Sequence, residues 1–74
     1  MNEEIKEIMA EVFKIDKDSI SDDIRKFEFE KWDSLAHISL IAALEDHFNV
    51  VFDVDEIMEI STIEEIDNLI KKYK

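Results

Sequence analysis

The chain contains no glycine and no proline among its 74 residues, and this absence limits the folds open to it. Tight hairpin turns need residues with positive φ, usually supplied by Gly or Asn-Gly pairs, so a sheet protein is disfavoured. Phosphate-cradling glycine loops of the GxGxxG or P-loop kind are excluded for the same reason. The sequence therefore favours an all-α fold whose helices are joined by loops of Asp, Ser and Lys.

The length and composition predict one small cytoplasmic domain covering residues 1–74. Hydrophobic residues make up 46% of the chain, which is enough for a packed core. The absence of Cys excludes disulfides, thiolate zinc sites and Cys nucleophiles. No apolar run is long enough for a signal peptide or a membrane-spanning helix, so we expect no membrane insertion.

The charge balance restricts the possible partners. Twenty acidic residues against nine basic ones give a formal net charge of −11 at pH 7. Such a polyanion repels nucleic-acid phosphates and anionic lipid, whereas it attracts proteins with basic patches. We therefore expect a monomer that docks on basic protein surfaces and binds no nucleic acid.

Hydrophobic residues recur at helical spacing in four segments, namely 2–14, 33–47, 54–59 and 61–73. Three longer helices and one short helix predict a small four-helix bundle. Residues 15–32 show neither helical nor alternating period, so they are predicted to form a long loop. Its hydrophobic residues are expected to pin it to the core: Ile20, Ile24, Phe27, Phe29 and Trp32. Long loops in small domains are usually functional.

The second helix is expected to bury one stripe of hydrophobic side chains: Leu35, Ile38, Ile41, Leu44 and Phe48. We expect His37 at the boundary between core and surface. Asp53 and Glu56 have the spacing of a capping box at the start of the third helix. Ser61 with Glu64, or Thr62 with Glu65, offers two registers for the start of the last helix.

Two patterns resemble chemical sites but lack essential parts. The run that begins at Asp16 starts like a calcium loop, yet Ile20 occupies the third ligand position and Phe27 replaces the bidentate Glu. A solvated acidic loop without a metal explains it better. Asp33, Ser34 and His37 contain the residue types of a hydrolytic triad, and Ser34 and His37 lie one helical turn apart. A triad also needs an oxyanion hole and a substrate cleft, for which so short a chain has little room, so we expect no catalytic residues.

Ser34 remains as the candidate site because it lies at the start of a helix after a long loop. A helix N-terminus presents free N–H groups and a positive dipole end to any phosphate bound there. A plain helix-capping Ser or Asp is the alternative at this position, and position alone favours it.

The stretch Trp32-Asp33-Ser34-Leu35, together with the spacing of the four helices, resembles the acyl carrier proteins. The resemblance covers nearly the whole chain and includes Ile38, Leu40, Ile41, Leu44, Glu45 and Phe48. It implies that Ser34 carries a 4′-phosphopantetheine arm, derived from coenzyme A, through a phosphodiester. It also implies that Asp33 helps the transferase to recognise the site, with Leu35 completing the Asp-Ser-Leu motif.

The resemblance implies a carrier that holds an acyl or aminoacyl group as a thioester and is not itself an enzyme. Its expected partners are a phosphopantetheinyl transferase, an acyl-activating ligase and a downstream acyltransferase or synthase. Fatty-acid carriers usually have a Gly two residues before the Asp, where this chain has Lys31. Trp-Asp-Ser is more typical of discrete carriers that serve dedicated pathways.

The partner surface is expected on the second and third helices. Fatty-acid carriers often have a partner-facing Glu and Met where this chain has Ser39 and Ala42. The acidic residues expected to complete the surface are Glu45, Asp46, Asp55 and Glu56. The alternative function is a non-catalytic, acidic protein-interaction bundle in which Ser34 is only a helix cap.

Overall fold

The structure, a computed structural model, describes residues 2–73 and is built from α-helices. Helix α1 spans Asn2–Phe13, α2 spans Ser34–Phe48, α3 spans Val54–Glu59 and α4 spans Ile63–Tyr73. The predicted all-α bundle of three longer helices and one short helix is therefore confirmed. The long loop between α1 and α2 contains one short 3₁₀ helix, η1, at Lys17–Ser19.

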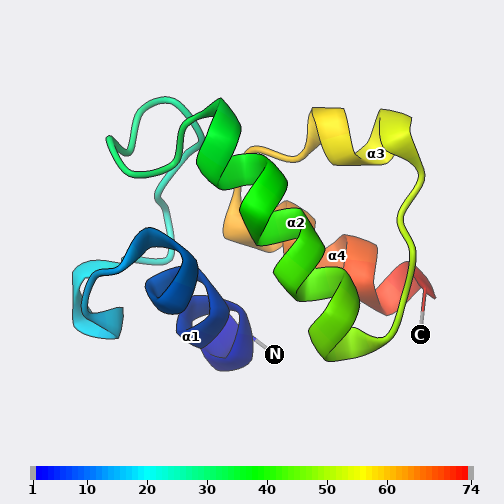
Figure 1. The fold of residues 1–74 in the computed structure, drawn as a ribbon, viewed down its shortest axis with the longest axis horizontal. Helices are drawn as coiled ribbons and strands as arrows, with labels where there is room; N and C mark the ends of the chain where they lie inside the picture. The colour runs from blue at the N-terminus through cyan, green and yellow to red at the C-terminus, as the bar shows by residue number, and fades with distance from the viewer. Residues whose placement is uncertain (1, 74) are drawn as a thin grey trace.

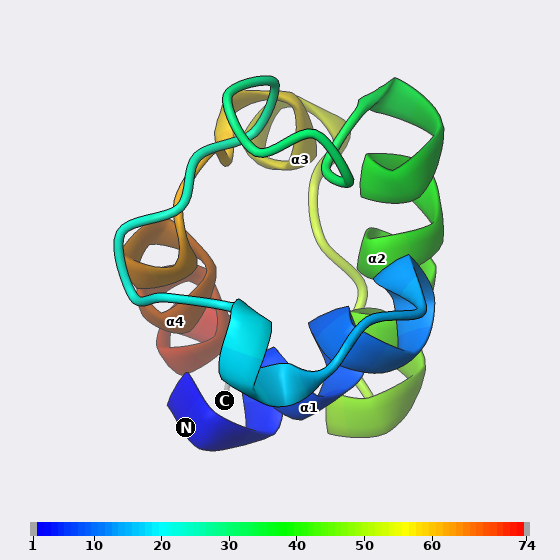
Figure 2. The same ribbon diagram turned by 90° about the vertical axis from the view of Figure 1, so that its left-hand side faces the viewer.

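The helices surround a single hydrophobic core (Figure 1). The N-terminal end of α2, the loop that precedes it and α3 lie at the same end of the molecule, as Figures 1 and 2 both show. The fully buried large side chains come from three of the helices and from the loop: Ile5, Met9, Trp32, Leu40, Leu44, Ile63, Ile66 and Ile70. Helix α3 contributes no residue of the buried class, so its position depends on other contacts.

The long loop is fixed to the core by some of its hydrophobic residues and not by others. Ile20 and Trp32 are buried, whereas the Phe27 side chain is 68% exposed, so the prediction that Phe27 packs on the core is wrong. The backbone N–H of Lys26 donates to the carbonyl of Ser61 at 2.9 Å, which ties the loop to the start of α4. Phe27 follows Lys26 directly and has a φ of 74°.

The buried face of α2 agrees with the predicted stripe from Ile41 onward and differs from it in the first turns. Leu35 and Ile38 are 75% and 69% exposed, whereas His37, which we expected at the boundary, is 5% exposed. The residues that face the core are His37, Leu40, Ile41, Leu44 and Phe48. Hydrophobic residues occur on almost every face of this helix, so periodicity alone does not select the buried one.

Two helices end in the left-handed conformation that glycine usually supplies. Lys14 after α1 and Asn49 after α2 have φ of 59° and 56°. In each case the next N–H reaches back to a carbonyl in the last turn, Ile15 to Ala10 and Val50 to Glu45, both at 3.1 Å. These are Schellman-type endings, so the chain closes its helices without glycine.

The predicted caps of α3 and α4 are present, with additional contacts at α3. Asp53 caps α3, but its side chain accepts a hydrogen bond from the N–H of Asp55 at 3.4 Å rather than from that of Glu56. The Glu56 carboxylate bonds to the backbone of Asp53, as the predicted box requires, and also contacts Lys72 and Tyr73 on α4. At α4 the Thr62 register is used: Thr62 Oγ1 accepts from the N–H of Glu65 at 3.1 Å.

Candidate functional site

Ser34 is the first residue of α2, and the cap of this helix is the residue before it. Asp33 has an extended backbone, and its Oδ1 accepts a hydrogen bond from the N–H of Ala36 at 2.9 Å. The first intrahelical bond runs from the N–H of His37 to the carbonyl of Asp33 at 2.8 Å. The interpretation of Ser34 as only a helix cap is therefore wrong, because Asp33 performs that role.

The Ser34 side chain is free to be modified. It is exposed, and no hydrogen bond engages its hydroxyl among residues 2–73. The N–H groups of Ser34 and Leu35 lie in the first turn, where a helix has no intrahelical acceptors, and Asp33 satisfies only that of Ala36. These N–H groups and the positive end of the α2 dipole favour a phosphate ester on Ser34, so the residues present fit a phosphopantetheine group.

His37 lies one turn beyond Ser34 but does not act on it. Its Nδ1 accepts a hydrogen bond from the Trp32 indole N–H at 3.0 Å, and its Nε2 lies 2.9 Å from the carbonyl oxygen of Ile57. Both ring nitrogens are therefore occupied, so His37 cannot serve Ser34 as a general base. This geometry removes the triad interpretation.

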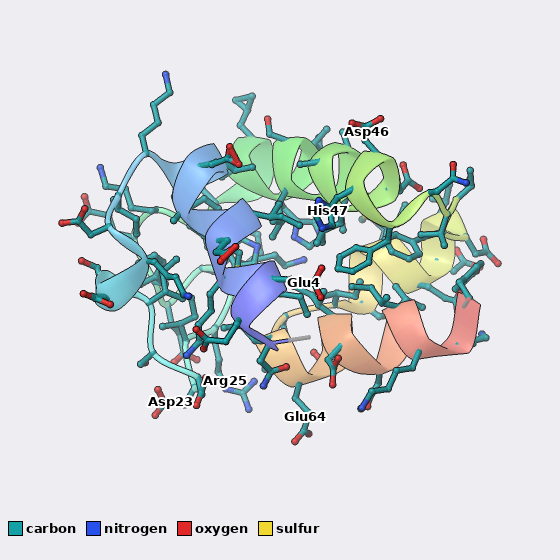
Figure 3. The ribbon with its side chains drawn as sticks, turned by 90° about the horizontal axis from the view of Figure 1, so that it is seen from below. Glu4, Asp23, Arg25, Asp46, His47 and Glu64 are labelled. Atoms are coloured by element: carbon teal, nitrogen blue, oxygen red, sulfur yellow. The ribbon has the colours of Figure 1, made fainter. Side chains whose placement is uncertain are left out.

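The predicted acidic surface divides into exposed and internally engaged residues. Asp46 and Asp55 are exposed, and Figure 3 shows Asp46 projecting outward from α2. Glu45 is half-buried, and its Oε2 accepts from the N–H of Phe52 at 2.8 Å. Hydrogen bonds from Lys72 and then Tyr73 hold the pKa of Glu56 below its usual range. Glu45 therefore has a structural contact that the sequence did not indicate, and Glu56 has contacts with α4 besides its predicted role at the start of α3.

A line of exposed side chains runs along α2 from the candidate serine. Leu35, Ser39, Ala42 and Asp46 follow one another at spacings of four, three and four residues, and all are exposed. Other exposed apolar side chains occur on α2 and on α3: Ile38, Val54 and Met58. Sequence reasoning assigned Ile38 to the core and made no prediction for the side chains of Val54 and Met58. The combination of apolar and acidic exposed residues is suited to protein contact.

Comparison with known proteins assigns the chain to a family. Residues 3–70 match the family model described as the phosphopantetheine attachment site. The chain is also similar to an acyl carrier protein of Lactobacillus acidophilus, with 31% identity over 70 residues. That alignment covers 95% of this chain and 88% of the relative. Within residues 2–73, no helix is long and apolar enough to cross a membrane.

Carriers of this family hold their prosthetic group covalently and perform no catalysis of their own, which agrees with an exposed serine beside an occupied histidine. The match extends over nearly all of the chain, from α1 through α4. The chain therefore belongs to the acyl carrier protein family and carries 4′-phosphopantetheine.

Proposed function

We propose that Ser34 is the attachment site of the phosphopantetheine arm and that the protein transports an acyl or aminoacyl group between enzymes. The observation that carries this proposal is the exposed Ser34 hydroxyl in the first turn of α2, whose cap is supplied by Asp33. The hydroxyl makes no hydrogen bond within residues 2–73, so it is available for esterification.

The chemistry divides between the arm and the chain. When bound, the arm supplies a terminal thiol that holds the cargo as a thioester. The chain holds the Ser34 oxygen at a rigid helix start, since Asp33 and the backbone bond of His37 fix the first turn. The N–H groups of Ser34 and Leu35 stabilise the negative charge of the phosphodiester.

The proposed partners are a phosphopantetheinyl transferase, an acyl-activating ligase and a downstream acyltransferase or synthase. The transferase is proposed because members of this family need one to receive the arm. The ligase and the acyltransferase or synthase are proposed because a carrier needs enzymes that load and remove its cargo. A cytoplasmic, monomeric state stays a prediction.

The carrier role can be tested on protein isolated from cells that produce it. Hydroxylamine attacks the carbonyl of a thioester, so the cargo leaves as a hydroxamate and the thiol is set free. We expect intact-mass spectra to show cargo on the arm that hydroxylamine removes, and an amine-specific reagent then separates aminoacyl from acyl cargo. Cargo that resists hydroxylamine would contradict thioester carriage.

We further propose that the outer line of α2, defined by Leu35, Ser39, Ala42 and Asp46, docks on basic partner surfaces together with Asp55. The exposure of all five side chains supports this surface. Steering by exposed charges acts mainly on association and fades as salt screens it. Glu45 and Glu56 are less suited to a direct test, because each also supports the fold.

The double variant Asp46→Lys with Asp55→Lys should therefore be modified several times more slowly than wild type at low salt. The difference should narrow at high salt, because the Debye length falls to about 3 Å at 1 M. Initial rates of modification with coenzyme A and a transferase measure both effects.

A matched control reverses Asp23 and Glu64, two exposed acidic residues that lie opposite Asp46 in Figure 3. Asp23→Lys with Glu64→Lys changes the net charge equally. It should be modified at nearly the wild-type rate. Equal slowing of the two double variants would mean that overall charge, rather than the α2 surface, controls docking.

A further inference from the structure

The buried imidazole of His37 joins three separate parts of the chain. The Trp32 indole N–H donates to His37 Nδ1 at 3.0 Å, and the two ring planes lie within 23° of each other. An indole nitrogen can only donate, so Nδ1 carries no proton. The proton of the neutral ring is therefore on Nε2, which donates to the carbonyl of Ile57 at 2.9 Å.

Helix α3 depends strongly on such polar contacts. It spans six residues, none of the buried class, and Ile57 is its one side chain that packs against the core, so polar contacts add to limited apolar packing. Carbonyls in the last turn of a helix have no intrahelical partners, and here two of them are satisfied from outside. His37 binds the carbonyl of Ile57, and the Lys26 ammonium lies 3.4 Å from that of Met58. The other end of α3 is held by the contacts of Glu56 and Asp53 with Tyr73.

The same imidazole supports the segment that presents Ser34. Trp32 is fully buried and lies two residues before Ser34, and His37 lies three residues after it. The Phe13 ring of α1 packs on Trp32 with centroids 6.2 Å apart. The contact between Trp32 and His37 therefore closes the turn that carries Ser34, and the contact between His37 and Ile57 links this turn to α3.

We propose that His37 is a positioning residue, whose neutral imidazole holds the Ser34 turn and α3 in the arrangement that partner enzymes recognise. The proposal rests on the carrier function of Ser34. Protonation would place a proton on Nδ1, where it faces the indole N–H of Trp32. Two donors cannot share a hydrogen bond, so the contact between Trp32 and His37 breaks in acid and releases the Trp32 segment that precedes Ser34, while Nε2 continues to donate to the carbonyl of Ile57.

The surroundings of His37 oppose its protonation. Burial lowers the pKa of His37, the hydrogen bond to Ile57 raises it by a smaller amount, and the Lys26 ammonium lowers it further. The nearby carboxylates are turned away: Asp33 caps α2, Glu56 contacts α4 and Glu59 is exposed. Helix α1 contributes only the uncharged Phe13 ring, through Trp32.

The direction of the pH effect follows from this lowered pKa. The folded pKa lies below the unfolded value of about 6.5, so the unfolded chain binds more protons between the two values. The stabilisation is complete above about pH 6.5 and is lost as the pH falls through the folded pKa. Carboxylates titrate mainly below about pH 5, so the window above that pH reports on the imidazole.

The test compares pH profiles of Ser34 modification in a background without the other histidine, His47→Gln. The added variant His37→Gln keeps one acceptor and one donor but does not titrate. The ratio of the two rates at each pH cancels the pH dependence of the transferase. We expect this ratio, His37 protein over His37→Gln, to fall severalfold between about pH 7.5 and pH 5. A constant ratio, with both proteins modified on Ser34, would overturn the positioning role and leave the carrier function intact.

A second measurement does not depend on the transferase or on how well the variant folds. In the His47→Gln protein, nuclear magnetic resonance follows the His37 ring together with the indole N–H of Trp32, the only tryptophan. We expect the indole proton and the amides of Ala36 and His37, which bond to Asp33, to lose protection from exchange as His37 titrates. Titration of His37 without a change in the exchange of the indole proton or of these amides would overturn the proposal. In the modification assay, absence of Ser34 modification in every protein would instead refute the proposed function.

Discussion

The variant Ser34→Ala should accept no phosphopantetheine and should still unfold within about 0.5 kcal/mol of wild type. The side chain is exposed and its hydroxyl has no hydrogen bond within residues 2–73, so its removal takes nothing from the fold. Modification is measured by thiol labelling after incubation with coenzyme A and a transferase, and stability by urea unfolding.

Two variants of the neighbouring residue separate attachment from capping. Asp33→Ala keeps the hydroxyl but removes the cap on Ala36, which should cost about 1 kcal/mol of stability. Asp33→Asn keeps a capping oxygen and removes the charge, so it should stay stable while modification slows if the transferase reads the carboxylate. Modification of Ser34→Ala at the wild-type level would show that the arm is attached elsewhere.

Replacing Trp32 by Ala should produce the largest loss of stability among single substitutions, about 3–5 kcal/mol. Trp32 is fully buried, packs on Phe13 and donates to His37, so its removal leaves a cavity and an unpaired buried nitrogen. A domain of this size has a total stability of only a few kcal/mol, so much of the protein should be unfolded at 37 °C. Urea unfolding and thermal melts measure the loss.

The matched control is Phe27→Ala, which removes an aromatic side chain of the same loop that is 68% exposed. It should change the stability by less than about 0.5 kcal/mol. A loss below 1 kcal/mol for Trp32→Ala would contradict the central place of Trp32 in the fold.

The helices could be predicted from the sequence because their hydrophobic periods are clear. The last helix alternates buried isoleucines with charged residues, and its inner face, which includes Ile63, Ile66 and Ile70, was correctly predicted. The inner face of α2 was predicted only in part, at Ile41, Leu44 and Phe48, since hydrophobic residues also occur on its outer face. Its buried histidine is stabilised by Trp32 and Ile57, partners that only the tertiary structure brings together.

The absence of glycine led to the correct fold class but not to the details of the loops. Lys14, Phe27 and Asn49 adopt positive φ without it. Asn takes this conformation readily because its short polar side chain tolerates it, whereas Lys and Phe do so at a cost of about 1–2 kcal/mol. No local pattern marks these two positions, because hydrogen bonds of the folded chain impose their conformation.

The candidate site could be located from the sequence because the Asp-Ser-Leu motif resembles that of acyl carrier proteins. The structure adds that Asp33 and Ser34 have different roles. Asp33 caps the helix, which leaves Ser34 without a structural role within the described chain. The internal contact of Glu45 could not be predicted from the sequence. A carboxylate that binds a distant N–H, as Glu45 binds that of Phe52, looks like any exposed acid in the sequence.

The attachment site is tested most directly by fragment mass spectrometry of the protein after incubation with coenzyme A and a phosphopantetheinyl transferase. We predict one phosphopantetheine per chain, carried by the fragment with Ser34, and none on the Ser34→Ala variant. An unmodified wild-type protein, or an arm located on Ser19, Ser21 or Ser39, would contradict the assignment.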